Sequence, residues 1–216
     1  MTCPIPHGID FGPRMLTRIG LVIWLGASIV VGCSQQPDSP ATPSPPAASA
    51  DLSATLVADK SPTDAEKKEL LAAKDALFTQ LSGRLMQAVG QGGPANAISV
   101  CSKEARSIAA SVGSEMNVRI GRTGVRLRNP ENQPPTWAET LCADQTAEPV
   151  FGVLTDSRAV ALLPIRLQSQ CLACHGPEAS LDASVKEQLA TLYPNDAATG
   201  FRDGELRGWF WIETLP

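Results

Sequence analysis

The chain has 216 residues, of which 43% are hydrophobic and 19% are charged, and its formal net charge is −4 at pH 7. This length and composition fit one domain of ordinary size with a hydrophobic core. The acidic balance argues against a nucleic-acid-binding protein, because such proteins present a basic face to the phosphates.

Residues 1–32 have the pattern of a bacterial lipoprotein signal peptide. Two arginines, Arg14 and Arg18, precede the apolar run 19–31, which is shorter than a bilayer-spanning helix requires. The run ends in Val-Val-Gly followed by Cys33, which resembles a lipobox. We therefore expect Cys33 to carry a lipid and to become the N-terminus of the mature protein.

Two alternatives concern this segment. Met15 is an alternative start, which would remove residues 1–14, and the apolar run is alternatively an uncleaved signal anchor. Each version places the rest of the chain at the periplasmic face of a bacterial membrane. Ser34 and Gln35 follow Cys33 without the aspartate typical of inner-membrane retention, so the outer membrane is slightly favoured.

Residues 33–60 are predicted to form a tether, and residues 61–216 a single domain. The tether is rich in Pro, Ala, Ser and Thr. Prolines at this density exclude a helix or a central strand and favour a solvated, semi-extended chain. The prolines concerned are Pro37, Pro40, Pro43, Pro45 and Pro46.

A long helix is predicted to open the domain. Ser61-Pro62 supplies a cap and a proline at the first helical position, and the glycines at 90, 92 and 93 are expected to end the helix. Leucines at helical spacing form its apolar stripe. They are Leu70, Leu77, Leu81 and Leu85.

A second helix is predicted from Pro94 to Gly113. Its apolar positions recur every three or four residues, which places Cys101 on the inward face of the helix. The positions are Ile98, Cys101, Ala105, Ile108 and Val112.

Strands are expected to dominate the rest of the chain. The expected elements are a strand at 117–120, a turn at 121–124, a short helix at 137–142, a hairpin of 149–155 with 160–167, a helix at 184–192 and a strand at 206–214. Helices first and strands later, with hairpin connections, predict an α+β fold with an antiparallel sheet.

Cys171-Leu172-Ala173-Cys174-His175 is the most informative motif of the chain. C-x-x-C-H is the attachment site of c-type haem, in which both thiols form thioethers and the histidine becomes an axial ligand. A zinc site would need two more ligands at close spacing, and a dithiol redox pair would give the histidine no role. The motif predicts one covalently bound haem c, which agrees with export from the cytoplasm.

The second axial position has several candidate donors. His7, the other histidine, lies in the signal region, which leaves Met86, Met116, a lysine, a cysteine or an open site. Cys101 is preferred, because it lies on an apolar helical face near a helix N-terminus, where a thiolate is stabilised. The alternatives are a buried core thiol and a disulfide between Cys101 and Cys142.

Several sequence blocks together resemble a bacterial c-type haem family with a PAS-like domain, long labelled a domain of unknown function. The resemblance runs through nearly all of residues 61–216. Its blocks are Ala97-Ile98-Ser99-Val100-Cys101-Ser102, Arg126-Leu127-Arg128-Asn129-Pro130-Glu131-Asn132, Cys171-Leu172-Ala173-Cys174-His175-Gly176, Leu192-Tyr193-Pro194-Asn195-Asp196-Ala197-Ala198-Thr199-Gly200-Phe201 and Gly204-Glu205-Leu206-Arg207-Gly208.

The resemblance implies a PAS-like sheet with the haem held against it. The best-described cyanobacterial member has His/Cys axial ligation, which implies Cys101 as the ligand opposite His175. It also implies that Arg128 lies near the haem, in contact with a propionate. The resemblance implies no role for Cys142.

A thiolate ligand stabilises ferric iron, so this ligand set predicts a low-potential haem. We expect electron transfer with a separate partner protein; the alternative is a haem-based redox or gas sensor that works through a partner. The sequence holds no acid–base pair typical of an enzyme, and a weak peroxidase-like activity, which needs an open distal side, is the minor alternative.

Overall fold

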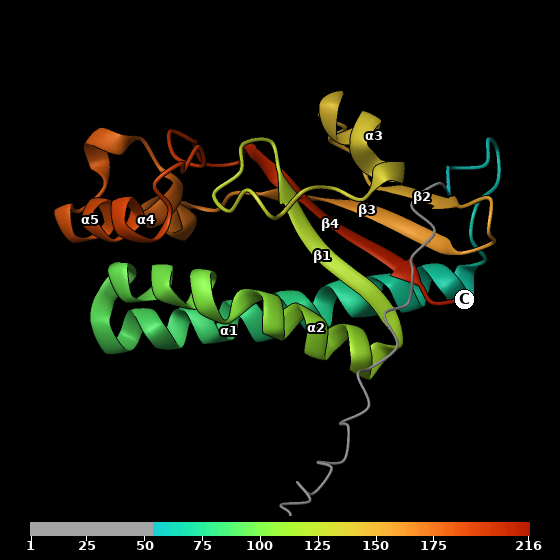
Figure 1. Ribbon diagram of the computed structural model, residues 1–216, viewed down its shortest axis with the longest axis horizontal. Coiled ribbons are helices and arrows are strands. Elements are labelled where there is room, and N and C mark those ends of the chain that lie inside the picture. Colours follow the sequence, from blue (N-terminus) through green and yellow to red (C-terminus); the bar gives the residue numbers. More distant parts are fainter. Residues whose placement is uncertain (1–53) are drawn as a thin grey trace, which may run out of the picture. The chain divides into compact units, whose positions relative to one another are not determined.

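The computed structural model describes residues 54–216 (Figure 1). The predicted signal peptide and lipidation site lie outside the described residues, as does the predicted tether up to residue 53. The elements are α1 (Asp64–Lys103), α2 (Ala105–Met116), β1 (Val118–Gly124), η1 (Thr136–Ala138), α3 (Glu139–Ala143), β2 (Val150–Val153), β3 (Ala159–Arg166), η2 (Ser169–Cys171), α4 (Leu172–His175), η3 (Glu178–Ser180), α5 (Ala183–Leu192) and β4 (Leu206–Thr214).

The predicted α+β class is confirmed. The four strands form one antiparallel sheet in the order β1-β4-β3-β2, and the long helix α1 precedes them all. Helices α1 and α2 cover one face of this sheet, and η1 and α3 lie over the other (Figure 1). Among the described residues, no helix combines the length and the apolar character needed to cross a bilayer.

Helix α1 starts two residues later than Ser61-Pro62 predicted. Thr63 is the N-cap: its hydroxyl accepts a hydrogen bond from the Glu66 N–H (3.2 Å), and its own N–H donates to the Glu66 carboxylate (2.7 Å). This reciprocal pair satisfies two N–H groups that would otherwise lack partners. A capping box therefore fixed the start of the helix more strongly than the proline did.

The predicted break at the glycines is confirmed. Gly92 and Gly93 leave helical geometry, and Gly93 has a φ of 74°, which favours glycine. The chain reverses there, so that the part of α1 from Pro94 onward runs back beside the first part (Figure 1). Asn96 Nδ2 donates to the Ala88 carbonyl across the reversal (3.0 Å). The result is a helical hairpin with Cys101 on its returning arm.

Gly113 does not stop the second helix, contrary to prediction. Helix α2 continues to Met116 and ends at Asn117, which adopts the left-handed conformation with φ of 54°. Gly113 is buried, and a Cβ there would lie 2.8 Å from the Val118 carbonyl oxygen. The glycine allows helix and strand to approach closely, which a sequence pattern cannot distinguish from a helix terminator.

The turn predicted at 121–124 is also wrong. These residues continue β1, which pairs with β4 from Val118↔Thr214 to Gly124↔Gly208. Gly121 lies against the indole of Trp211, and a Cβ there would overlap the ring. Glycines next to Arg and Thr are typical of turns, but here they make room for a large neighbour on the adjacent strand.

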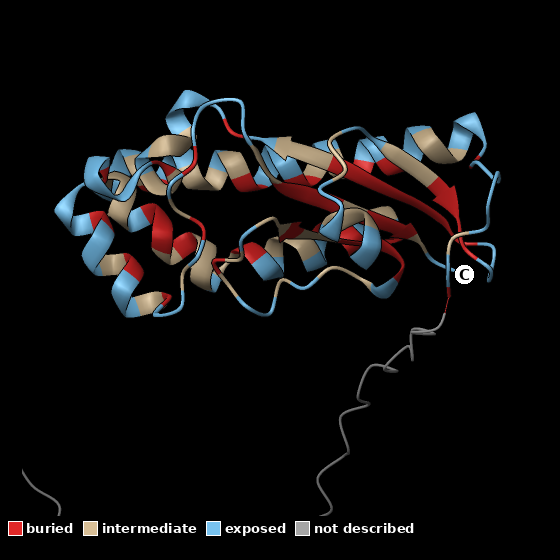
Figure 2. Ribbon diagram, turned by 90° about the horizontal axis from the view of Figure 1, so that it is seen from above, coloured by how far each residue is buried: buried red, intermediate tan, exposed pale blue. Residues whose placement is uncertain are grey.

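The hydrophobic core lies on both faces of the sheet (Figure 2). Alternate residues of β4 serve the two faces: Phe210 and Ile212 pack against α1 and α2, and Trp209 packs against η1.

Glu213 of β4 is a buried charge within this core. Its carboxylate pairs with Arg119 (2.9 Å) and with Arg158, and it accepts the indole N–H of Trp137 (2.9 Å). Such partners are what a desolvated carboxylate requires. Glu213 of β4 thereby links β1 and Arg158, the residue just before β3, to η1.

The folded domain begins earlier than residue 61. Leu56 forms a β-bridge with Leu154, the Val57 N–H donates to the Val153 carbonyl (2.9 Å), and Ala54 is buried. The last residues assigned to the tether therefore extend the sheet beside β2. The few leucines beside the proline-rich segment form no periodic pattern, so the sequence does not predict that these residues join the sheet.

Gly121→Ala is expected to lower the free energy of unfolding by about 1–3 kcal/mol, because the new methyl group displaces the Trp211 ring. Gly83→Ala is the matched control, since a Cβ at this helical, exposed position meets nothing within 4 Å. It should stabilise by about 0.5–1 kcal/mol. Urea denaturation measures both; equal effects would contradict the packing account.

Candidate functional site

A cavity of about 330 Å³ lies between the helical hairpin, the end of the sheet and the segment from Leu167 to His175. Its wall is mostly apolar. The cavity is lined by Phe78, Leu81, Ser82, Leu85, Met86, Val89, Ala97, Ile98 and Cys101 of α1, by Arg122, Thr123, Gly124, Leu127, Arg128, Asn129 and Asn132, by Ile165, Leu167, Gln168, Gln170, Cys171, Cys174 and His175, and by Tyr193, Arg207 and Phe210. Predicted site residues far apart in sequence therefore meet at one place.

The two motif cysteines and the histidine lie on one tight helical segment. Turn η2 ends at Cys171, and α4 continues to His175. Gly176 ends α4 with its N–H donating to the Leu172 carbonyl (2.9 Å), and a Cβ on it would lie 2.6 Å from that oxygen. The glycine after the histidine thus lets the chain leave the turn at once.

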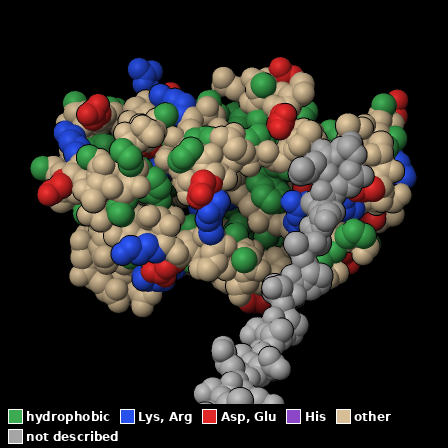
Figure 3. All heavy atoms as spheres, viewed as in Figure 1, with side chains coloured by type: hydrophobic (Ala, Val, Ile, Leu, Met, Phe, Trp, Pro, Cys, Tyr) green, Lys and Arg blue, Asp and Glu red, His purple; other side chains and the backbone are tan. Residues whose placement is uncertain are grey.

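The His175 ring is held in one orientation. Its Nδ1 lies 2.7 Å from the Ala198 carbonyl oxygen, to which an Nδ1–H donates, so that Nε2 is the nitrogen free to bind a metal. Burial, together with the charges of Arg128 and Arg207, holds the pKa of His175 well below its usual range. The imidazole is therefore neutral at pH 7, which is the form that ligates iron. On the face shown in Figure 3, no histidine side chain is visible among the described residues.

Arg128 joins the histidine turn to the segment that carries Ala198. Its Nε donates to Asp196 (3.1 Å), and its Nη2 donates to the carbonyls of Cys174 (2.6 Å) and Ala198 (3.3 Å). The side chains of Arg128 and Asp196 are only 7% and 9% exposed. Because most of this guanidinium is occupied by the protein, its role in the structure is to hold the loop. The propionate contact predicted for Arg128 stays a prediction.

Cys101 lines the same cavity as His175, from the returning arm of the α1 hairpin. Its thiol is half-buried and unpaired. Gln188 Nε2 on α5 donates to the Ser99 hydroxyl on this arm (3.1 Å), and Ile98 packs against α5, which fixes the arm in place. All four residues predicted to hold the haem therefore line one cavity. They are Cys171, Cys174, His175 and Cys101.

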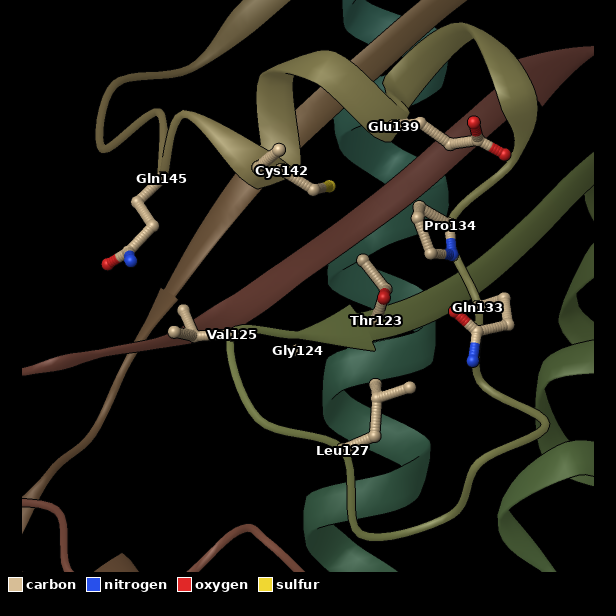
Figure 4. Close-up of a pocket in the computed structure, with 10 residues that line it drawn as sticks. Thr123, Gly124, Val125, Leu127, Gln133, Pro134, Glu139, Cys142 and Gln145 are labelled. Atoms are coloured by element: carbon tan, nitrogen blue, oxygen red, sulfur yellow. The ribbon is translucent and has the colours of Figure 1, made fainter.

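Cys142 lies in a different pocket, on the other face of the sheet. It packs with the cluster around Trp209 and lines a separate pocket of about 370 Å³ with Thr123 and Glu139 (Figure 4). Burial raises the pKa of its thiol to about 11, so it is protonated and unreactive at neutral pH. The sheet separates Cys142 from Cys101, and both are unpaired, so the alternative disulfide between them is not formed.

The methionine candidates differ in position. Met86 lines the cavity and is 60% exposed at its edge. Met116, at the end of α2, packs against the core between the helices and the sheet and does not line the cavity. No group of three or more His, Cys, Asp or Glu side chains gathers among residues 54–216 in a way that could hold a metal ion, as a zinc site would require.

Three titratable residues of the cavity were not among the predicted site residues: Arg122, Tyr193 and Arg207. Arg122 fell in the segment interpreted as a turn. Tyr193 and Arg207 belong to sequence blocks of the family resemblance, and that was the one available signal for them. Burial is the main cause that raises the pKa of Tyr193 and lowers that of Arg207, the latter to about 10.

Comparison with known proteins gives two matches. The family model described as Tll0287-like matches residues 47–214. The crystal structure of the cyanobacterial heme-protein Tll0287 is similar to this chain with a TM-score of 0.51 and 23% sequence identity, over 72% of this chain and 97% of that one. At this identity the structural likeness shows the fold alone. No curated protein matches the chain.

Arg128→Ala is expected to cost about 3–5 kcal/mol of unfolding free energy, because it leaves Asp196 buried and unpaired. Arg106→Ala is the control: Arg106 pairs with Glu131, but the two side chains are 59% and 62% exposed, so the loss should be below about 1 kcal/mol. Urea denaturation of the full chain measures both, and similar losses would refute the anchoring role of Arg128.

Proposed function

Because this chain belongs to the Tll0287-like family, we propose that it is a c-type haem protein with one haem covalently bound in the cavity between α1 and α4. The observation that carries the proposal is the arrangement of Cys171, Cys174 and His175 on one turn of the cavity wall, with Nδ1 bonded to Ala198. The family's cyanobacterial crystal structure is that of a heme-protein, which agrees with this assignment.

The cavity suits a haem in three respects. Leucines and other apolar side chains from α1 and β3 would cover the porphyrin faces. The two motif thiols lie on the same turn, as addition to the two vinyl groups requires. The cavity also holds arginines, whose charge complements the two carboxylates of a haem.

We further propose that Cys101 is the axial ligand opposite His175. Both side chains line the cavity from different elements, Cys101 from α1 and His175 from α4. Arg122 lines the cavity too. The neutral His175 would complete a His/Cys pair.

The proposed role is electron transfer with a separate partner protein. When bound, the haem supplies one-electron chemistry at its iron, at a low potential if a thiolate is a ligand. The chain's part is to hold His175 in one orientation and to surround the site with apolar side chains. A redox sensor is the second candidate, because Met86 lines the same cavity as Cys101 and offers a second sulfur donor for a change of ligand.

We also propose that the protein is anchored by a lipid on Cys33 at the periplasmic face of a bacterial membrane. The support is the basic, apolar and Val-Val-Gly-Cys pattern of residues 14–33. Such an anchor would keep a small electron carrier near membrane-bound partners.

Cys171→Ala combined with Cys174→Ala is expected to abolish covalent haem in cells that mature c-type cytochromes. Acidified acetone extracts non-covalent haem, and haem staining of a denaturing gel shows what remains attached. Wild type should stain and the double variant should not. A stained double variant, or an unstained wild type, would refute the attachment site.

Cys101→Ala is expected to change the ferric absorption spectrum from low-spin to high-spin or to a new ligand set, because it removes the proposed sulfur ligand. Cys142→Ala is the matched control, since Cys142 lies on the other face of the sheet, and should leave the spectrum unchanged. If the Cys101→Ala spectrum equals that of the wild type, Cys101 is not a ligand, and Met86 becomes the next candidate.

Cys33→Ala is expected to move the protein from the membrane fraction to the soluble periplasmic fraction, because it removes the acylation site. Immunoblots of fractionated cells measure the change. Ser34→Ala is the control, because it alters the neighbouring residue but keeps the cysteine that would be acylated. A Cys33→Ala protein that stays in the membrane would favour the signal anchor.

A further inference from the structure

Arg122 occupies a position in β1 that the alternation of side chains along the strand assigns to the core face. Val118 and Ile120 point to the face of the sheet that packs on the helices, and both are buried. Arg122 follows them at the same spacing of two, opposite Phe210 on β4. Its side chain therefore enters the cavity from the apolar face of the sheet.

Arg207 enters the same cavity from β4. Its Nη1 donates to the Arg126 carbonyl (2.9 Å), and its guanidinium lies 5.5 Å from the centre of the Phe201 ring. The guanidinium passes over Gly124, where a Cβ would overlap it. The position is thus set by a hydrogen bond, by an aromatic ring and by the absence of a side chain on β1.

These two arginines differ from the other arginines of the described domain, because they are half-buried and form no ion pair with a carboxylate. Five arginines form ion pairs, namely Arg84, Arg106, Arg119, Arg128 and Arg158. Three without an ion pair are exposed, namely Arg126, Arg166 and Arg202. Within residues 54–216, only Arg122 and Arg207 are half-buried and also lack an ion pair.

Two partly desolvated guanidinium groups in one cavity are unfavourable unless an anion binds there and neutralises their charge. Burial lowers the pKa of both, and the charges of Arg128 and Arg122 lower that of Arg207 further. Arg122 lines the same cavity as Cys101 and His175, the two residues proposed to hold the iron.

We propose that Arg122 and Arg207 bind the two propionate carboxylates of the haem. The inference rests on the proposed function, since it needs a haem in this cavity. Arg128 is less suited to this task, because its Nε and Nη2 already donate to Asp196, Cys174 and Ala198. Arginine fits carboxylates well, because its planar fork can donate two hydrogen bonds to one group.

The test is resonance Raman spectroscopy of the haem-loaded full chain, in which the propionate bending vibration shifts when a propionate loses a hydrogen-bond donor. Arg122→Gln and Arg207→Gln are each expected to shift this band and to lower the midpoint potential, because a carboxylate charge is no longer neutralised. Arg122→Lys and Arg207→Lys should restore part of the potential. Arg202→Gln, an exposed arginine outside the cavity, should change neither quantity.

Two results would overturn the inference while haem attachment stands. One is a propionate band that stays at the wild-type frequency in both Gln variants. The other needs no variant: a wild-type band at the frequency of free, solvated propionates. A wild-type protein without covalent haem would instead refute the proposed function, so the two failures are distinguishable.

Discussion

The site depends on one buried guanidinium. Arg128 bonds to the carbonyls of Cys174 and Ala198 and pairs with Asp196, so it ties the Cys-x-x-Cys-His turn to the segment that orients His175. Ala198 in turn accepts the Nδ1–H of His175, and the Phe201 N–H donates to the His175 carbonyl (3.0 Å). A histidine can serve a metal only if its free nitrogen points in a fixed direction, and this small network supplies that direction.

The other half of the site comes from the reversal of α1. A single unbroken helix would carry Cys101 far from the sheet, since each residue adds about 1.5 Å of length. Gly92 and Gly93 turn the chain back instead, and the salt bridge between Arg84 and Glu104 (2.7 Å) holds the two arms together. Contacts between Ile98 and α5 then seat the returning arm over the cavity.

The electrostatics of the cavity follow from this framework. Desolvation keeps the His175 imidazole neutral, while the arginines at the sheet end make the cavity positive. A neutral imidazole, thiols and sheltered guanidinium groups together suit a ligand that combines a metal, an apolar plane and carboxylates. The strands that carry these arginines are held from the opposite face of the sheet, where the Trp137 indole donates to the buried Glu213 carboxylate (2.9 Å).

The sequence by itself determined most of the elements and the attachment motif. Helical spacing, the proline and glycine positions and the Cys-x-x-Cys-His pattern are local, so the break at Gly92 and Gly93, the hairpin of β2 and β3 and the strand Leu206–Thr214 were predictable. Only the tertiary structure decided what the glycines at 113 and 121 do, because their reason is a neighbour on another element. Only the tertiary structure decided the surroundings of Arg122 and Arg128 as well. Whether an arginine is exposed, ion-paired or half-buried without a partner depends on which groups the fold brings around it.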